Sequence, residues 1–400
     1  MVLDDITQDS LPLTRGAIHG LTRGRSKHCC NHFLNGKICN SHCTMTTMMM
    51  AIVALTAQLA TADVGSHPIY PPCMPSMTCF QISPYPDDSL VFDCAAVNSS
   101  IPTKGNVYFM HGNDGPRSKG MWSLIMQRFA AEGYNTLACD QRGFSPGASP
   151  YVPTAYNYDF LAQDIFAIAD NYFGVGGKFH VVAHDQGARV GWHALRAVGS
   201  GRSRFASYSP LSEAHSDAFS DALYGPNPDP VQQLNFQYLR QFTLNNSVLT
   251  YEQNIWHRLC QQPYGYKTPR ACQTAIWWYQ GAIASGNLAV QPFTGIFGPI
   301  GTMFGIPASF VKEHTPYPLN GLPQRTKVGE VKTVPVFYIC GASDLADKCT
   351  DRFRDATAKL VTNFKYLRLE ACGHDLTTPQ QCSEYEKVVD GMVNFVKSVA

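Results

Sequence analysis

The stretch FHVVAHDQG, residues 179–187, decides the fold of this 400-residue chain. Its apolar first half predicts a buried strand over 179–183, and the sequence that follows it predicts a helix over 188–198. Small residues stand two positions before and two positions after Asp185, which is the small-x-nucleophile-x-small pattern of a sharp strand-to-helix turn. Such a turn has no room for bulky neighbours, and it holds its central side chain above the edge of the sheet.

The central side chain of this turn is a carboxylate, and that restricts the chemistry. A carboxylate that attacks an ordinary ester would form a strained anhydride. Attack on a saturated carbon that carries a leaving group forms a stable ester, which water can then hydrolyse. Asp185 therefore indicates cleavage of a C–O or C–halogen bond, and we expect no cofactor. Taken alone, the pentapeptide is also compatible with a turn or helix N-cap aspartate.

Size and charge exclude several function classes. The chain is long enough for one large α/β domain or two smaller ones. The net charge is +1, with no basic block and no acidic tail, so nothing favours nucleic acid as a partner. We expect a small-molecule substrate instead.

The first 62 residues differ from the rest and are predicted to be a leader with a signal peptide. An apolar run over 48–60 is too short to span a bilayer, and Ala60-Thr61-Ala62 follows it. We expect cleavage after Ala62, secretion and no stable membrane span. The translation start could be Met45 or Met48, and a short buried helix is the alternative interpretation of the run. A Cys/His cluster within 29–43 fits no metal spacing, so we expect no metal site.

Ten cysteines follow the expected cleavage site. Two of them, Cys139 and Cys340, fall in predicted core strands and are expected to stay free. The other eight are expected to form four disulfides of undetermined connectivity: Cys73, Cys79, Cys94, Cys260, Cys272, Cys349, Cys372 and Cys382. Asn98 and Asn245 begin N-glycosylation sequons, which gives weak further support for secretion.

Strands and helices alternate from Gly105 onward. Strands are predicted at 106–110, 134–139, 179–183, 205–209, 334–340 and 364–369. Helices are predicted between or after them at 121–132, 158–172 and 382–399. This alternation predicts an α/β fold with a mostly parallel sheet flanked by helices.

One segment breaks the alternation. Residues 213–332 are rich in aromatic and amide side chains and include a Gly/Pro-rich stretch. We interpret this segment as a helical cap inserted between two parts of the core, where a lid over the strand ends would lie. The predicted core parts are therefore 63–212 and 333–400.

Several motifs follow one another in the order found in a known family. His111-Gly112 follows a strand, Asp140-Gln141-Arg142-Gly143-Phe144 follows the next strand, His184-Asp185 forms the turn, Trp278-Tyr279 lies in the cap, and Gly373-His374 follows the last strand. From about 106 to the C-terminus the chain resembles the α/β-hydrolase superfamily. Within it, the chain is most similar to the branch of epoxide hydrolases and haloalkane or haloacetate dehalogenases.

The resemblance implies a catalytic triad. Asp185 matches the nucleophile, and His374 matches the base that activates water against the covalent ester. Asp344, in a Gly-x-x-Asp pattern after a strand, matches the acid that holds the imidazole in its working tautomer. Asp347 is the alternative acid. The order of nucleophile, acid and histidine along the chain is the order that this fold uses.

The resemblance also implies an oxyanion hole and a substrate pocket. Backbone N–H groups of Asn113 and Gln186 are expected to stabilise the tetrahedral intermediate. The related loop usually reads His-Gly-x-Pro, whereas here the proline is displaced to Pro116. The side chains expected around the substrate are His111, His184, Tyr238 and Trp278.

The leaving group separates the two reactions of this branch. Epoxide opening needs a proton, and Tyr279 matches one of the two cap tyrosines that supply it. Gln241 stands where the other would be, with Tyr238 one turn away. Haloalkane dehalogenases carry Trp and haloacetate dehalogenases carry Arg at the position of Gln186. Arg189 matches a second arginine of the haloacetate enzymes, but it could equally pair within the core.

Epoxide hydrolysis to a diol is therefore the expected reaction. Dehalogenation of a small organic halide is the alternative, and a catalytically weak protein that binds a small ligand under the cap is a second alternative. The tryptophans at 256, 277 and 278 are also consistent with simple packing inside the cap.

Overall fold

The computed structural model describes residues 73–87, 89–113, 119–196, 201–244, 258, 260, 269–288, 297–298, 304–314 and 326–399. The expected leader and signal peptide, the Cys/His cluster, Pro116, Asn245 and Trp256 lie outside these ranges.

An eight-stranded sheet forms the centre of the fold, in the order β1-β2-β4-β3-β5-β6-β7-β8. The strands are β1 (Thr78–Ile82), β2 (Phe92–Val97), β3 (Gly105–Met110), β4 (Tyr134–Cys139), β5 (Phe179–His184), β6 (Phe205–Leu211), β7 (Val336–Gly341) and β8 (Phe364–Leu369). The β1–β2 and β2–β4 pairs are antiparallel, and all other pairs are parallel. The prediction of a mostly parallel sheet is confirmed.

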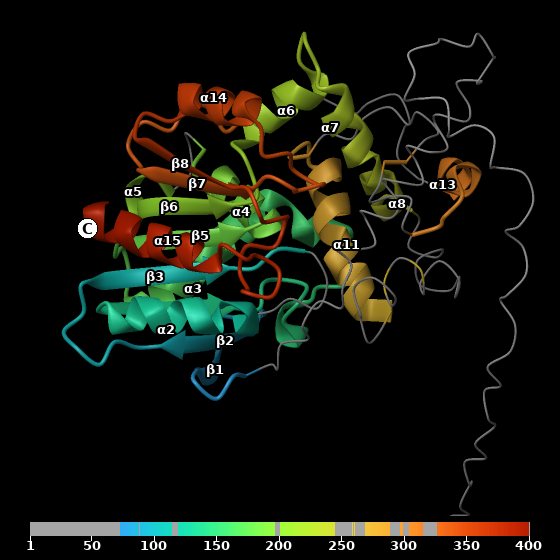
Figure 1. Ribbon diagram of the computed structural model, residues 1–400. Helices are drawn as coiled ribbons and strands as arrows, with labels where there is room; N and C mark the ends of the chain where they lie inside the picture. The colour runs from blue at the N-terminus through green and yellow to red at the C-terminus, as the bar shows by residue number, and fades with distance from the viewer. Residues whose placement is uncertain are drawn as a thin grey trace, which may run out of the picture. The chain divides into compact units, whose positions relative to one another are not determined.

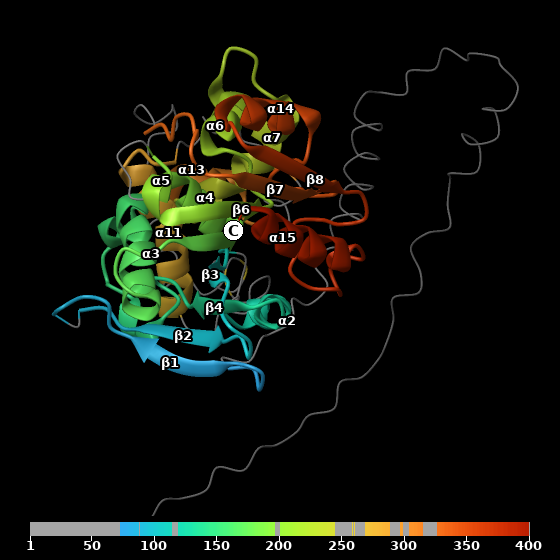
Figure 2. The same cartoon turned by 90° about the vertical axis from the view of Figure 1, so that its left-hand side faces the viewer.

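Helices cover both faces of the sheet, as Figures 1 and 2 show. One face packs against α2 (Ser123–Ala131) and α15 (Tyr385–Val399), and the other against α3 (Tyr158–Phe173) and α4 (Gln186–Ala194). The central strand β5 is buried along its whole length, which fits its nearly continuous apolar sequence. Further helices complete the core: α5 (Gly201–Arg204), α14 (Asp351–Leu360), η1 (Lys119–Trp122), η2 (Pro146–Ala148) and η3 (Pro153–Tyr156).

A helical segment is inserted between β6 and β7. It contains α6 (Ser216–Tyr224), α7 (Pro230–Asn235), η4 (Phe236–Tyr238), α8 (Leu239–Phe242), α11 (Pro269–Ala284) and α13 (Ala308–His314). Helix α11 lies beside the carboxyl ends of the parallel strands (Figure 1). None of the helices in the described ranges is long and apolar enough to span a membrane.

The cysteines correct one prediction. Every cysteine of the described residues is in a disulfide: Cys73–Cys79, Cys94–Cys139, Cys260–Cys272, Cys340–Cys349 and Cys372–Cys382. The expectation that Cys139 and Cys340 stay free was wrong. Cys139 lies directly opposite Cys94 in the antiparallel β2–β4 pair, and β2 had no recognised sequence pattern. Cys340 is the next-to-last residue of β7 and bonds to Cys349 across the loop that follows.

Candidate active site

Asp185 lies at the turn between β5 and α4, and its backbone geometry is unusual. Its φ of 52° and ψ of −127° are disfavoured for a residue with a side chain. The turn is tight because a Cβ on Gly187 would lie 2.3 Å from the His111 carbonyl oxygen. A Cβ on Gly112 would lie 2.5 Å from Asp185 Oδ1. These two glycines therefore allow the carboxylate to sit where it does.

His374 bridges the Asp185 carboxylate and Asp344. Its Nε2 lies 3.4 Å from Asp185 Oδ2, and its Nδ1 lies 2.8 Å from Asp344 Oδ2. Nδ1 therefore donates to Asp344, and Nε2 faces Asp185. Asp347, the alternative acid, does not occupy this position.

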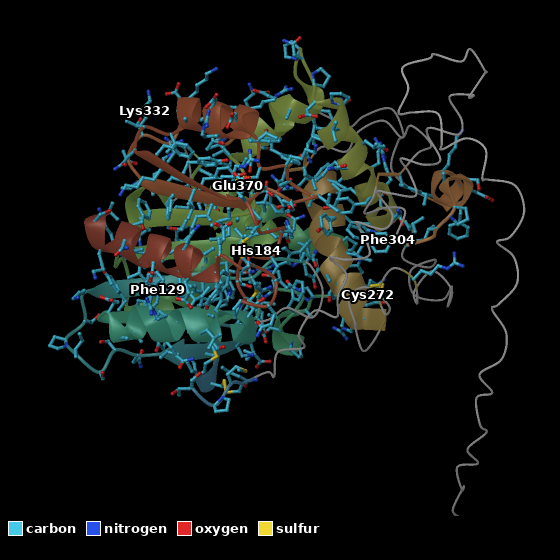
Figure 3. The ribbon with its side chains drawn as sticks, viewed as in Figure 1. Phe129, His184, Cys272, Phe304, Lys332 and Glu370 are labelled. Atoms are coloured by element: carbon cyan, nitrogen blue, oxygen red, sulfur yellow. A yellow bond between two sulfur atoms is a disulfide. The ribbon has the colours of Figure 1, made fainter. Side chains whose placement is uncertain are left out.

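The loops that carry Asp344 and His374 are held by backbone contacts. Asp344 Oδ1 accepts hydrogen bonds from the N–H groups of Ala346 (2.8 Å) and Asp347 (3.2 Å). The His374 carbonyl accepts from Ser212 Oγ (2.7 Å) and from His184 Nε2 (2.9 Å). A carbonyl oxygen can only accept, so His184 Nε2 carries a proton. Figure 3 shows His184 among the side chains between the sheet and α11.

The charges in this group stabilise one another. Burial alone would raise the pKa of Asp185, yet the hydrogen bond and charge of His374 hold that pKa well below its usual value. Burial alone would lower the pKa of His374, but Asp344 and Asp185 together raise it well above its usual value. The pair therefore rests as a carboxylate beside an imidazolium.

Asn113 joins the carboxylate to the inserted helical segment. Its backbone N–H donates to Asp185 Oδ1 at 2.7 Å, and its Nδ2 donates to the Ala275 carbonyl in α11 at 2.6 Å. The structure thus places the Asn113 N–H directly on a carboxylate oxygen of Asp185. The other expected donor, Gln186, begins α4, and its side-chain Oε1 accepts from the Tyr158 hydroxyl at 2.7 Å.

His111 and Trp278 lie together at the junction of core and inserted segment. His111 Nε2 accepts from the Gln141 N–H at 2.9 Å, and the rings of His111 and Trp278 lie 6.4 Å apart. Trp278 Nε1 donates to the Arg142 carbonyl at 2.6 Å. Both side chains are fully buried. They fix α11 against the loops that follow β3 and β4.

The two candidate tyrosines are buried around one phenylalanine. The Tyr279 ring lies 4.8 Å from the Phe242 ring, and the Tyr238 ring lies 5.4 Å from it. Tyr279 follows Ala275 by one helical turn, and long helical side chains lean toward the helix N-terminus. The Tyr279 side chain therefore leans toward the turn that Asn113 contacts.

Arg189 belongs to a buried ionic cluster. Its guanidinium binds Glu213 through Nε (2.9 Å) and Nη2 (2.6 Å), and Nη2 lies 3.4 Å from Asp347 Oδ2. Burial and then the charge of Glu213 raise the pKa of Asp347 well above its usual value. The guanidinium also covers the rings of Phe219 (4.8 Å) and Phe236 (5.5 Å) in the inserted segment. Sequence reasoning missed Glu213, since a lone glutamate after a strand carries no motif.

Metal binding has no support in the part of the chain that the structure describes. No group of three or more His, Cys, Asp or Glu side chains is arranged there to hold an ion.

Comparisons with known proteins agree with the fold. Residues 107–390 match a family model described as "Alpha/beta hydrolase family". Over 86 residues the chain is 36% identical to epoxide hydrolase B of Mycobacterium tuberculosis, which covers 22% of this chain and 23% of that protein. Over 85 residues it is 33% identical to epoxide hydrolase 3 of Mus musculus, and that match covers 21% of this chain and 22% of the mouse protein. The chain thus spans about a quarter of the length of the curated relatives it matches.

Two solved structures show the same architecture. An epoxide hydrolase from metagenomes of hot environments has a TM-score of 0.58 and 20% identity, covering 80% of this chain and 98% of that one. Epoxide hydrolase VrEH1 from Vigna radiata has a TM-score of 0.50 and 19% identity, covering 82% and 100%. At these identities the likeness concerns the fold.

Proposed function

The chain belongs to the α/β-hydrolase family, and from that premise we propose that it hydrolyses epoxides to diols through a covalent ester on Asp185. One observation carries the proposal. The Asp185 carboxylate lies at the strand-to-helix turn with the Asn113 N–H on Oδ1 and His374 beside Oδ2. The epoxide hydrolases that share sequence and fold with the chain support the choice of substrate.

In the first step Asp185 acts as the nucleophile. Oδ1 stays on the Asn113 N–H, and Oδ2 attacks an epoxide carbon. A bond from Oδ2 to that carbon forms, and the ring C–O bond breaks. The ring oxygen takes the proton of the Tyr279 hydroxyl and becomes the first alcohol. A general acid of this kind is worth roughly 10²- to 10⁴-fold in rate.

Before the second step the His374 imidazolium gives up its Nε2 proton, which restores the Tyr279 hydroxyl, and His374 then acts as the base. It takes a proton from water through Nε2 while the water oxygen attacks Cγ of Asp185. The negative charge then develops on Oδ1, where the Asn113 N–H already donates. Collapse breaks the bond between Cγ and Oδ2, and the departing Oδ2 takes the remaining proton of the former water molecule. The diol therefore leaves with Oδ2, and the water oxygen remains in the Asp185 carboxylate. Asp344 holds the imidazole through Nδ1 throughout.

Two features argue against the halide alternative. Gln186 replaces the Trp or Arg that follows the nucleophile in the dehalogenases, and Tyr158 binds its side-chain oxygen. Arg189, which would bind the carboxylate of a haloacid, is already paired with the Glu213 carboxylate and is only 6% exposed. An arginine already neutralised and buried offers little to a substrate carboxylate.

Isotope labelling tests the covalent route. A single turnover in H₂¹⁸O should place ¹⁸O in the peptide that contains Asp185 and leave the diol unlabelled. Direct attack of water on the epoxide would label the diol instead. The His374→Gln variant should accumulate the ester on Asp185, visible by mass spectrometry. An adduct on another residue would contradict the proposal.

We also propose that the protein acts in the secretory pathway. All ten cysteines that follow Ala62 are within bonding distance of a partner. Such use of cysteine is typical of an oxidising compartment.

A further inference from the structure

Three asparagine side chains and two aromatic rings line an open pocket of about 450 Å³: Asn98, Asn106, Asn135, Tyr172 and Phe173. Small-molecule sites commonly measure roughly 300–1,000 Å³. The pocket lies at the amino-terminal ends of β3 and β4, where Asn106 and Asn135 are paired neighbours. The candidate catalytic groups follow the carboxyl ends of the parallel strands, at the opposite edge of the sheet.

Asn98 stands at the rim of this pocket, in the turn after β2. It is exposed and begins the tripeptide Asn98-Ser99-Ser100, an acceptor for N-linked glycans. The Tyr172 hydroxyl donates to its Oδ1 at 3.0 Å. A glycan attaches to Nδ2 and leaves Oδ1 in place, so this hydrogen bond can orient the modified side chain as well.

The pocket has the chemistry that an N-acetylglucosamine ring needs. The C–H face of a sugar packs against aromatic rings, here those of Tyr172 and Phe173 at the end of α3. Hydroxyl and acetamido groups need donors and acceptors, which the Asn106 amide and the Asn135 Nδ2 provide. Asn135 Oδ1 already accepts from the Ser99 N–H at 3.3 Å. The Tyr172 ring is itself held by stacking on Phe80 at 5.3 Å. The wall of the pocket is therefore preorganised.

We propose that Asn98 carries an N-linked glycan whose first sugar lies in this pocket. A lipid-diphosphate-linked oligosaccharide is the donor. The bond from Nδ2 to the sugar C1 forms, the C1–O bond to the diphosphate breaks, and Nδ2 loses one proton. The site requires passage through the secretory pathway and is independent of the proposed reaction.

The first measurement is occupancy. The full chain, with its own N-terminal residues, is produced in a eukaryotic secretory host and mapped by mass spectrometry before and after N-glycosidase treatment. The wild type and the Ser100→Thr variant should carry a glycan on Asn98, and the Ser100→Ala variant should not. An unmodified Asn98 in the wild type overturns the proposal. Epoxide turnover should be equal in all three, so a missing activity would count against the proposed function alone.

The second measurement tests whether the sugar occupies the pocket. Ser100→Ala should lower Tm by roughly 2 °C, because it removes a packed ring and changes nothing else in the pocket. In an Asn106→Ala/Tyr172→Phe background, Ser100→Ala should leave Tm almost unchanged, because the pocket contacts of the sugar are already lost. The four proteins form a double-mutant cycle, in which groups that contact each other have non-additive effects. An equal loss of Tm in both backgrounds would show a glycan that projects into solvent, and it would overturn the assignment of the pocket.

Discussion

At the scale of single residues, the position of Asp185 between Asn113 and His374 explains how one histidine can serve both states of the proposed cycle. The carboxylate helps to raise the pKa of His374 in the free protein. Once Asp185 becomes an ester it loses its charge, and only Asp344 still supports the imidazolium. The pKa of His374 therefore falls when the base is needed.

This change predicts different pH dependences for the two steps. Ester formation needs ionised Asp185, whose pKa is low, so its rate should be level between roughly pH 5 and 8. Ester hydrolysis needs neutral His374, so its rate should fall about tenfold for each pH unit below the histidine pKa in the ester. Rapid-quench single turnovers should show the ester accumulating in acid. Parallel loss of both rates would contradict this assignment.

Arg189 is predicted to stabilise the fold and not to bind substrate. Arg189→Met leaves Glu213 buried without its partner, and removing one member of a buried pair costs roughly 3–5 kcal/mol. The control is Arg128→Met at the exposed Arg128–Asp390 pair, which should change the free energy of unfolding little. Urea unfolding measures both. A stable Arg189→Met protein that had lost only haloacid binding would favour the dehalogenase alternative.

At the scale of elements, the sequence predicted a strand or helix correctly where one apolar pattern runs through the whole element. The runs that became β5, β7 and β8 and the long helices α3 and α15 carry clear apolar patterns, and each prediction came within a few residues of the observed bounds. β1 went unrecognised because it is a short edge strand that is largely exposed. β2 lies inside the sheet, but its sequence, FDCAAV, shows neither a clean alternation nor a continuous run of large apolar residues. Since Cys94 lies in β2, the partner of Cys139 could not be foreseen.

The candidate site divides in the same way. Asp185, Asp344 and His374 each follow the end of a strand and occur in the motif order of the family, so the sequence was enough to predict them as candidates. The cluster of Arg189, Glu213 and Asp347 depends on three loops meeting, which no local pattern encodes. The contact of Asn113 with Ala275 likewise depends on how the inserted segment packs on the core.

Two disulfides enclose the loops of the proposed acid and the proposed base. Cys340–Cys349 closes the loop that contains Asp344, and Cys372–Cys382 closes the loop that contains His374. The loops also meet each other, because the Ser343 N–H donates to the Cys372 carbonyl at 3.0 Å. Asp185 is held separately by β5 and α4. The disulfides therefore restrain the groups of the second step more than the nucleophile.

Removing the base-loop disulfide should slow hydrolysis of the ester selectively. In Cys372→Ser/Cys382→Ser we expect ester formation to stay near the wild-type rate and ester hydrolysis to fall roughly tenfold or more, because small misplacements of a base are costly. Cys73→Ser/Cys79→Ser removes an exposed disulfide and serves as the control. Single-turnover kinetics at a temperature where both variants are folded separates the steps. Equal slowing of both steps would point to general loosening of the fold.

At the scale of the whole molecule, the strand order brings the candidate groups together. Asn113 follows β3, Asp185 follows β5, Asp344 follows β7 and His374 follows β8. These strands belong to the parallel part of the sheet, which runs from β4 to β8 in the strand order. Their carboxyl ends therefore lie at the same edge of the sheet. The helical segment inserted after β6 then lies at that same edge, which is why α11 reaches Asn113.

The part of the chain that the structure describes contains five disulfides, and this gives the last prediction. Protein purified from the medium of a secreting host should begin at Asp63, because the apolar run before Ala62 ends in a cleavage pattern. Such a chain contains only the ten cysteines that the structure pairs. Under denaturing conditions without reductant, iodoacetamide should therefore modify no cysteine, and after reduction it should modify all of them.

Peptide mass spectrometry and N-terminal sequencing measure both properties on one sample. Protein made in a reducing cytosol is the control, and it should be less stable because the unfolded chain regains the freedom that the cross-links remove. A secreted protein with free thiols at Cys139 and Cys340 would contradict the two pairings that sequence reasoning had missed. A chain that keeps residues 1–62 and has every thiol reduced would contradict the secretory proposal itself, while leaving the geometry around Asp185 open to the kinetic tests.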